Sequence, residues 1–228
     1  MTQHDGVSRR DVLKVVGAGL VAAATGGAAR AETEKAPKLA FKNADFYGAD
    51  GKFKPEAAKD AVIELMKYHG YPILKGVREK LWISDYGIGQ HATLGLAACM
   101  FMNNEKDRYM LMDIYLLPNQ FLPEHWHVAT DKNPVKMEGW LVRHGLSHIV
   151  GEGEPNLGKD VVIPKCHMDG TATVMHEVAA GPGDFVPLNR AGAHHWQLAG
   201  PEGAILSEVA NVHDNAGVRH EDKKLIFP

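Results

Sequence analysis

Apolar residues recur at helical spacing in one stretch of the chain. Between Pro55 and Gly70 they occupy positions that fall on one helical face, namely Ala58, Ala61, Val62, Leu65 and Met66. Proline is favoured in the first turn of a helix, and glycine is favoured just past its end. The pattern therefore predicts one amphipathic helix between these two residues.

Downstream of this helix, short apolar runs alternate with turn residues. The runs are ATLGLAACMFMNN, DRYMLMDIYLLPNQ, EGWLVRHGLSHIVG, TATVMHEVAAGPGDFVPL and GAILSEVANV. Glycine, proline and asparagine separate them, and no second long helical pattern follows. Five or more short strands of this kind predict an all-β sandwich or barrel. We expect the helix to pack on the outside of the barrel or to swap onto a neighbouring copy.

The first thirty-one residues follow a different pattern. SRRDVLK places two arginines ahead of VVGAGLVAAATGGAA, an apolar run too short to span a bilayer comfortably, and Ala29-Arg30-Ala31 has the small-x-small form of a cleavage site. The segment resembles a twin-arginine export signal, with matches at Ser8, Arg9, Arg10, Leu13 and Lys14 and with Val12 where phenylalanine is common. The resemblance implies the twin-arginine translocation machinery, cleavage after Ala31 and a periplasmic or secreted protein.

Two other interpretations of this segment are less consistent with its sequence. A first helix of the folded domain is disfavoured because the run has no polar face and contains glycines. An uncleaved membrane anchor is the other alternative, but we expect no stable membrane span. The predicted organisation is a signal over residues 1–31, a linker over 32–43 and a single domain over 44–228.

Composition places the chain among ordinary globular proteins. It has 228 residues, of which 45% are hydrophobic and 23% charged, and its formal net charge is −3. Removal of residues 1–31 would take away four basic and two acidic side chains and change the net charge to −5. The absence of a basic run beyond the signal argues against a nucleic-acid partner. Cys99 and Cys166 are too few for a disulfide framework; they either pair or are buried thiols, and we favour buried thiols.

Candidate chemistry lies between Pro123 and Trp140. His125 and His127 stand two positions apart after an expected strand, which places both imidazoles on one face about 7 Å apart. Lys136 and Glu138 repeat this spacing at the start of the next strand. Burial of four such groups would be costly unless a divalent metal offset it, and Mn, Fe, Zn, Co and Ni all accept these ligands. The alternative is a solvated polar loop, and the histidine pair alone does not decide between the two.

A second segment, GPGDFVPLNRAGAHHWQLAG, resembles the second motif of the cupin family through Gly183-Asp184 and the Gly-x-x-His ending at His195. The first cupin motif has His-x-His, a glutamate and a glycine seven positions after it, as Glu138 and Gly145 are spaced here. The resemblance implies a cupin-type jelly-roll barrel with His125, His127, Glu138 and His195 as metal ligands. Two departures are the ten residues between His127 and Glu138, where three or four are usual, and Arg190 in place of a proline.

The long spacing is similar to that of the D-lyxose isomerases, a sugar-isomerase branch of the cupins. The resemblance covers most of residues 83–215 and is carried by LLPNQFLPEHWH, by Lys136-Met137-Glu138 and by His195-Trp196 followed by Ala199-Gly200. It implies aldose–ketose isomerisation of a lyxose- or mannose-like sugar, with Mn as the metal and Zn or Fe as rivals. Export departs from this branch and leaves the substrate open. We also expect a homodimer, because exposed sheet edges and a free helix are often covered in that way.

Alternation of apolar residues predicts that Glu208 shares a buried face with Leu206, Ala210 and Val212. The alternative is a solvent-facing side chain. In the resembled isomerases a glutamate at this place moves the proton, which implies that role for Glu208. Lys136 would polarise an oxygen or donate a proton, and a neighbouring dication would lower its pKa.

Two other classes of function are compatible with the same predicted metal ligands. A metal-dependent cupin oxygenase would have a pocket lined with aromatic side chains, whereas a non-catalytic exported metal- or sugar-binding cupin would have Glu208 pointing away from the metal. The remaining histidines are expected outside the centre. By strand parity His144 and His148 share the face of Glu138 but lie further along, and His213 and His220 are expected in a solvated tail.

Overall fold

The computed structural model describes residues 38–227, which all belong to the larger of the two units into which the chain separates, Ala36–Pro228. The predicted export signal and its cleavage position lie outside these residues. The expected domain limits therefore stay predictions. Within the described range, none of the helices has the length and apolar character needed to traverse a bilayer.

The predicted amphipathic helix is present as α1, Pro55–Tyr68. Its buried face is the predicted one, and Val62, Leu65 and Met66 pack against the outer side of the sheet. The expectation that the helix lies outside the barrel is confirmed. The other helical elements are short: η2 spans Asn43–Phe46, α2 spans Val77–Lys80 and η3 spans Asn215–Gly217.

Apart from these helices and the connecting loops, the described chain forms strands, which confirms the all-β expectation. They are β1 Trp82–Ser84, β2 Leu96–Asn104, β3 Tyr109–Leu116, β4 Phe121–His127, β5 Glu138–Gly151, β6 His176–Ala180, β7 Phe185–Pro187, β8 His195–Ala210 and β9 Val218–His220. All their pairings are antiparallel.

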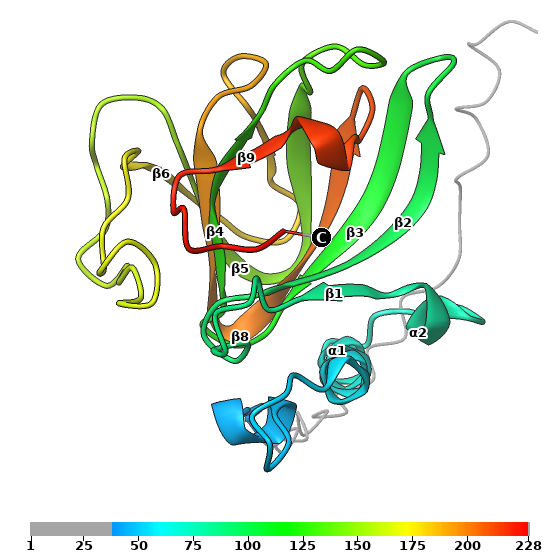
Figure 1. Cartoon of the computed structure of the whole chain (residues 1–228), viewed down its shortest axis with the longest axis vertical. Coiled ribbons are helices and arrows are strands. Elements are labelled where there is room, and N and C mark those ends of the chain that lie inside the picture. Colours follow the sequence, from blue (N-terminus) through cyan, green and yellow to red (C-terminus); the bar gives the residue numbers. More distant parts are fainter. Residues whose placement is uncertain (1–37, 228) are drawn as a thin grey trace, which may run out of the picture. The chain divides into compact units, whose positions relative to one another are not determined.

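The two long strands, β5 and β8, join the two halves of the barrel. The two strands pair antiparallel along nearly their whole length, so the first portion of β5 lies beside the last portion of β8. One half has the order β1-β2-β3-β8-β5-β7, and the other has the order β9-β4-β8-β5-β6. Because both long strands run through both halves, the sheet curls round into the cupin-type barrel expected from the sequence (Figure 1).

Glycines mark the bend between the halves. Gly145 and Gly203 have φ values of 74° and 75°, a left-handed conformation that other residues rarely adopt. A Cβ atom on Gly145 would overlap the carbonyl oxygen of Gly203. The glycine of the first cupin motif therefore allows β5 and β8 to approach closely where they turn from one half into the other.

The ladder of β5 shifts register twice, between Val142 and His144 and between Gly145 and Ser147. Each shift breaks the simple alternation of faces. The expectation that His144 and His148 share the face of Glu138 is therefore wrong. His144 packs against Tyr71 on the outside of the sheet, with ring centroids 5.7 Å apart, and His148 contacts Glu177.

The long connection between β5 and β6 packs on the outer side of the half of the barrel that contains β4 and β9. Trp196 donates a hydrogen bond to the carbonyl of Val174, and the buried carboxylate of Glu124 accepts hydrogen bonds from the amide and hydroxyl of Thr173. Both cysteines are free thiols, which confirms that they do not pair, but only Cys99 is buried and Cys166 is half-buried.

Candidate metal centre

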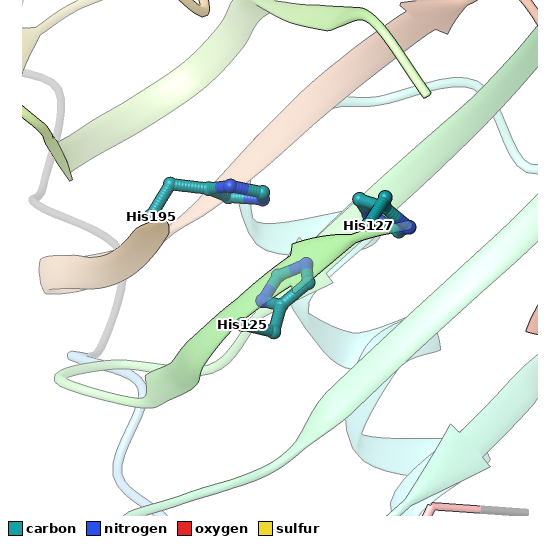
Figure 2. A group of neighbouring side chains, drawn as sticks. All are labelled: His125, His127 and His195. Atoms are coloured by element: carbon teal, nitrogen blue, oxygen red, sulfur yellow. The ribbon is translucent and has the colours of Figure 1, made fainter. Parts of the chain in front are cut away.

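Three histidines from two neighbouring strands converge inside the barrel. His125 and His127 lie on β4, and His195 begins β8, directly paired with His125. Their candidate ligand nitrogens all lie within 4.8 Å of one another. Figure 2 shows the imidazoles from both strands facing the same space. The two-residue spacing predicted from the sequence thus brings the histidines together as a group that can hold a metal ion.

Backbone carbonyls fix which nitrogen of two of these rings is protonated. The Nδ1 atoms of His125 and His195 lie 2.9 Å from the carbonyl oxygens of Pro123 and Ala193. Because a carbonyl oxygen only accepts hydrogen bonds, each Nδ1 carries the proton and each Nε2 offers its lone pair. Such contacts typically orient metal-binding histidines.

Several buried polar atoms at the centre of the group have no hydrogen-bond partner. They are Nε2 of His127, Nε2 of His195 and Oε1 of Glu138. The Glu138 atom lies 3.2 Å from the first nitrogen and 3.5 Å from the second. Ligands at about 2.1 Å from one ion are separated by roughly 3 Å when adjacent, so these atoms are placed as ligands of a shared cation would be. A divalent metal fits this donor set.

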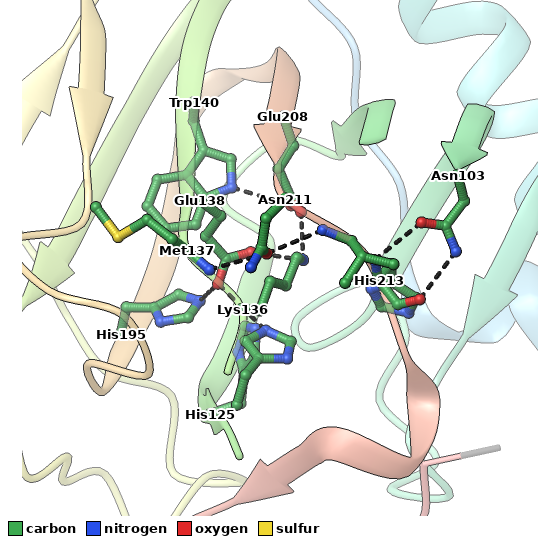
Figure 3. A network of polar contacts seen from close by, with 12 residues as sticks. Asn103, His125, Lys136, Met137, Glu138, Trp140, His195, Glu208, Asn211 and His213 are labelled. Carbon is green, nitrogen blue, oxygen red and sulfur yellow. Dashed lines mark hydrogen bonds and ion pairs between the residues drawn. The ribbon is translucent and has the colours of Figure 1, made fainter. Parts of the chain in front are cut away.

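Lys136 connects Glu138 to Glu208. Its Nζ atom lies 2.6 Å from Oε2 of Glu138 and 2.5 Å from Oε1 of Glu208, and all three side chains are buried (Figure 3). Burial alone would lower the pKa of Lys136, but the two carboxylates outweigh it and raise that pKa. This balance holds for the metal-free side chains, so the lowering expected from a neighbouring dication stays a prediction.

The pKa values of the two acids shift in opposite directions, although Lys136 acts to lower both. Burial acts to raise the pKa of Glu138, but Lys136 and the adjacent histidines hold it well below its usual value. For Glu208 burial dominates, and its pKa is raised. The second Glu208 oxygen accepts a hydrogen bond from Nε1 of Trp140 at 3.1 Å. Glu208 is only 3% exposed, so the predicted burial is confirmed and the solvent-facing alternative is wrong.

The ten residues between His127 and Glu138 form a loop that is tied to the chain after β8. The Asp214 carboxylate accepts hydrogen bonds from Oγ1 of Thr130 and from Nδ2 of Asn133, at 2.8 and 3.0 Å. Nearer the centre, the side chain of Asn211 bonds to the backbone on either side of Lys136. Because these contacts hold the loop in place, Lys136 and Glu138 lie beside the histidines despite the ten residues that separate His127 from Glu138.

A cavity of about 30 Å³ adjoins the histidine group. His213 and His220 line it, so their expected place in a solvated tail is wrong. Burial lowers the pKa of each to about 4. Aromatic side chains also line the cavity, namely Trp82, Tyr86, Trp140 and Phe227. The sequence offered little signal for either histidine, because both follow turns at which the alternation of β8 is lost.

Comparison with known proteins identifies relatives by sequence. The chain is 34% identical over 154 residues to a D-lyxose ketol-isomerase from Cohnella laeviribosi, with 68% of this chain and 82% of the relative covered. It is 30% identical over 164 residues to a D-lyxose/D-mannose isomerase from Thermosediminibacter oceani, covering 72% and 88%. An L-ribose isomerase structure from Cellulomonas parahominis aligns with a TM-score of 0.48 and 12% identity, covering 68% of this chain and 81% of that one. No family model matches the chain.

Proposed function

Because the chain belongs to the D-lyxose ketol-isomerase family and is a sugar isomerase, we propose that it uses a divalent metal to interconvert an aldose and a ketose of the lyxose or mannose type. The observation that supports this best is a pair of buried ion pairs, in which Lys136 contacts both Glu138 and Glu208 beside three histidines. It places acid–base groups next to a group of metal-ligating atoms.

The proposed ligands are His125, His127, Glu138 and His195. We propose Mn as the metal, with Zn and Fe as rivals, because imidazole and carboxylate ligands suit all three. A divalent cation held there would polarise the carbonyl and hydroxyl oxygens of the sugar.

Glu208 is the proposed base. Its carboxylate removes the proton from the carbon next to the carbonyl, which gives an enediol, and returns that proton to the neighbouring carbon. In an aldose the proton on C2 is thus returned to C1, and the proton of the C2 hydroxyl moves in the same direction to the C1 oxygen, so the atoms balance. Lys136 donates a hydrogen bond to the oxygen that gains negative charge. The raised pKa of Glu208 suits a group that must both accept and release a proton near neutral pH.

Neither alternative function is favoured by its own criterion. The cavity combines aromatic walls with histidine, lysine and glutamate side chains, so it lacks the purely aromatic lining expected of an oxygenase. Glu208 lines the cavity and contacts Lys136, whereas a non-catalytic binding protein was expected to have it pointing away.

The decisive experiment is turnover of D-lyxose and D-mannose by the Mn-loaded protein, measured as formation of the corresponding ketoses. We expect Glu208→Gln to abolish turnover while metal content stays near one equivalent. His144→Phe, on the outer side of the sheet, is the matched control and should retain activity. No ketose from the parent protein would refute the proposed reaction, and an active Glu208→Gln variant would refute the assignment of the base.

We also propose that the protein is exported by the twin-arginine route and processed after Ala31. The support is the match of SRRDVLK and Ala29-Arg30-Ala31 to such signals. Mass spectrometry of the protein from the periplasmic fraction should give a chain that begins at Glu32. Arg9→Lys/Arg10→Lys should keep the protein in the cytoplasm; unchanged export would contradict the proposed route.

Finally, we propose a homodimer. Phe101, Leu111 and Val209 are exposed apolar side chains on β2, β3 and β8, and the last two are direct partners across the ladder. An exposed group of this kind favours association with another protein surface. Light scattering should give twice the chain mass for the parent and the chain mass for Leu111→Lys. A monomeric parent would refute the dimer.

A further inference from the structure

Two histidines outside the ligand group share the cavity with it. His213 follows β8, and its ring centroid lies 6.3 Å from that of His127. His220 ends β9 and is paired across the ladder with His125, their ring centroids being 5.7 Å apart. Both therefore border the space that a sugar would occupy beside the metal, on the side formed by the C-terminal part of the described chain.

Three of the four ring nitrogens of these two histidines have no hydrogen-bond partner in the protein. Nε2 of His213 lies 2.7 Å from Oδ1 of Asn215, an acceptor, so Nε2 carries the proton and Nδ1 is a buried acceptor without a partner. Neither ring nitrogen of His220 has a hydrogen-bond partner. The backbone carbonyl of Glu124 acts to raise the pKa of His220, although burial lowers that pKa overall. Polar atoms left unpaired in a buried site are costly unless a ligand or water satisfies them.

Both imidazoles are held in place by the surrounding structure. The side chain of Asn103 donates to the carbonyl of His213 and accepts from its amide, at 2.9 and 3.0 Å (Figure 3). His220 is fixed by the β9 ladder and packs against Tyr86 and Phe227, with ring centroids 5.2 and 5.3 Å away. The rings are thus fixed polar groups with apolar neighbours, as in sites that select a ligand by its hydrogen bonds.

We propose that His213 and His220 bind the hydroxyl groups of the sugar that lie away from the metal and so determine which sugar is accepted. This inference rests on the proposed isomerase function. A neutral imidazole offers one donor and one acceptor, and a hydroxyl group can satisfy either. The C1 and C2 oxygens are assigned to the metal side of the cavity, which leaves the later hydroxyls for the two histidines.

A site of this type rejects an analogue that lacks the matching hydroxyl, because its own polar atoms then stay unpaired. We expect the parent protein to use 4-deoxy- or 5-deoxy-D-lyxose at least about tenfold less efficiently than D-lyxose, as expected from the loss of one buried hydrogen bond. In His220→Phe and His213→Leu the KM for D-lyxose should rise about tenfold, with a smaller change in kcat. The penalty against at least one deoxy analogue should disappear.

The experiment compares the Mn-loaded parent, both variants, His220→Gln and the outer-face control His144→Phe. His220→Gln keeps a donor and an acceptor and should recover part of the lost affinity, whereas the control should match the parent. Metal content and thermal unfolding verify that each variant is folded. An unchanged penalty against both analogues in both variants would overturn the inference.

Calorimetric binding of D-lyxose to the same Mn-loaded proteins separates this inference from the proposed reaction. If the parent binds the sugar without turning it over, the reaction is refuted, while weaker binding by both variants than by the control still supports the recognition role. Equal binding by the parent and both variants refutes the recognition role whether or not turnover occurs. No binding and no turnover by the parent refutes both.

Discussion

The side-chain amide of Asn211 holds the backbone on both sides of Lys136. Its Nδ2 atom donates to the carbonyl of Val135, and its Oδ1 atom accepts from the amide of Met137, each at 3.1 Å. The lysine that connects the two buried carboxylates is therefore positioned by the residue directly after β8, which ties the end of β8 to the backbone just before β5.

Replacement of Asn211 by alanine should displace Lys136 without removing any group from the cavity. Because small misplacements near reacting atoms are costly, we expect kcat for D-lyxose to fall about ten- to a hundredfold while KM changes less. Steady-state kinetics with metal analysis provide the measurement. Asn156→Ala, in the outer connection before β6, is the control; equal losses in both variants would indicate general destabilisation instead of positioning.

Replacement of Lys136 by methionine should leave two buried carboxylates without their shared cation. Loss of one partner from a buried ion pair typically costs about 3–5 kcal/mol, and we expect a loss of this size in the free energy of unfolding of the metal-free protein. The double variant Lys136→Met/Glu208→Gln should be less destabilised than the single one, because one charge is also removed. Urea unfolding in the presence of a chelator measures both, and additive effects would argue against the coupling.

Metal removal should destabilise the protein as well as inactivate it. Binding to the folded state alone raises stability by about 2.7 kcal/mol when the free metal is a hundred times its dissociation constant. We therefore expect a chelator to lower the Tm and Mn to restore it. His125→Ala/Glu138→Ala should show neither the bound metal nor the chelator effect. A parent protein whose Tm and metal content ignore the chelator would refute the metal centre.

Gly145→Ala tests the bend between the two halves of the barrel. The new methyl group would overlap the Gly203 carbonyl, and the left-handed backbone would add strain. Together these effects should lower the free energy of unfolding by more than about 3 kcal/mol. Gly51→Ala has a similar φ of 75° but no atom within 4 Å of the new methyl group, so it should cost only the backbone strain. Equal losses would show that the close approach contributes nothing.

His91 should make stability depend on pH. It is buried away from the metal centre against Phe46, and burial lowers its pKa to about 4. The unfolded state then binds more protons than the folded state between pH 6.5 and 4. The contribution of neutral His91 to the free energy of unfolding is complete above pH 6.5. It is lost as the pH falls towards 4, by up to about 3 kcal/mol.

Urea unfolding from pH 7.5 to 4.5 measures this dependence. Because His213 and His220 also have lowered pKa values, His91→Asn should reduce the loss of stability on acidification without removing it. The same pH dependence in the variant and the parent would exclude His91 as a source.

The elements with regular spacing were predictable from the sequence. A helical or alternating pattern of apolar residues that is maintained over several positions predicts the helix from Pro55, the common face of His125 and His127, and the burial of Glu208. Contacts that depend on an interruption of the period were not predictable. The register shifts of β5 turn His144 outward, and the turn before β9 brings His220 back beside His125.

The pKa of Lys136 shows a related limit. Sequence spacing placed Lys136 near the predicted metal ligands, but the second carboxylate reaches it from β8, far along the chain. The balance between charges of opposite sign depends on distances that only the folded chain sets. For the same reason the hydrogen bonds from the Asn211 side chain to the backbone around Lys136 could not be expected from the sequence.

The segment from Val218 to Phe227 borders the cavity beside the histidine group through Val218, His220 and Phe227. β9 is joined to β4 by only three residue pairs, and Phe227 rests on Tyr86 and Trp82 (Figure 1). We expect this short ladder to adjust when a sugar enters, while its pairing with β4 keeps the ring of His220 beside His125. Glu208 is only 3% exposed, so few solvent protons reach it. Hydrogen taken from one carbon of the sugar should accordingly return to the same molecule, so a deuterium label at C2 should be largely conserved in the product.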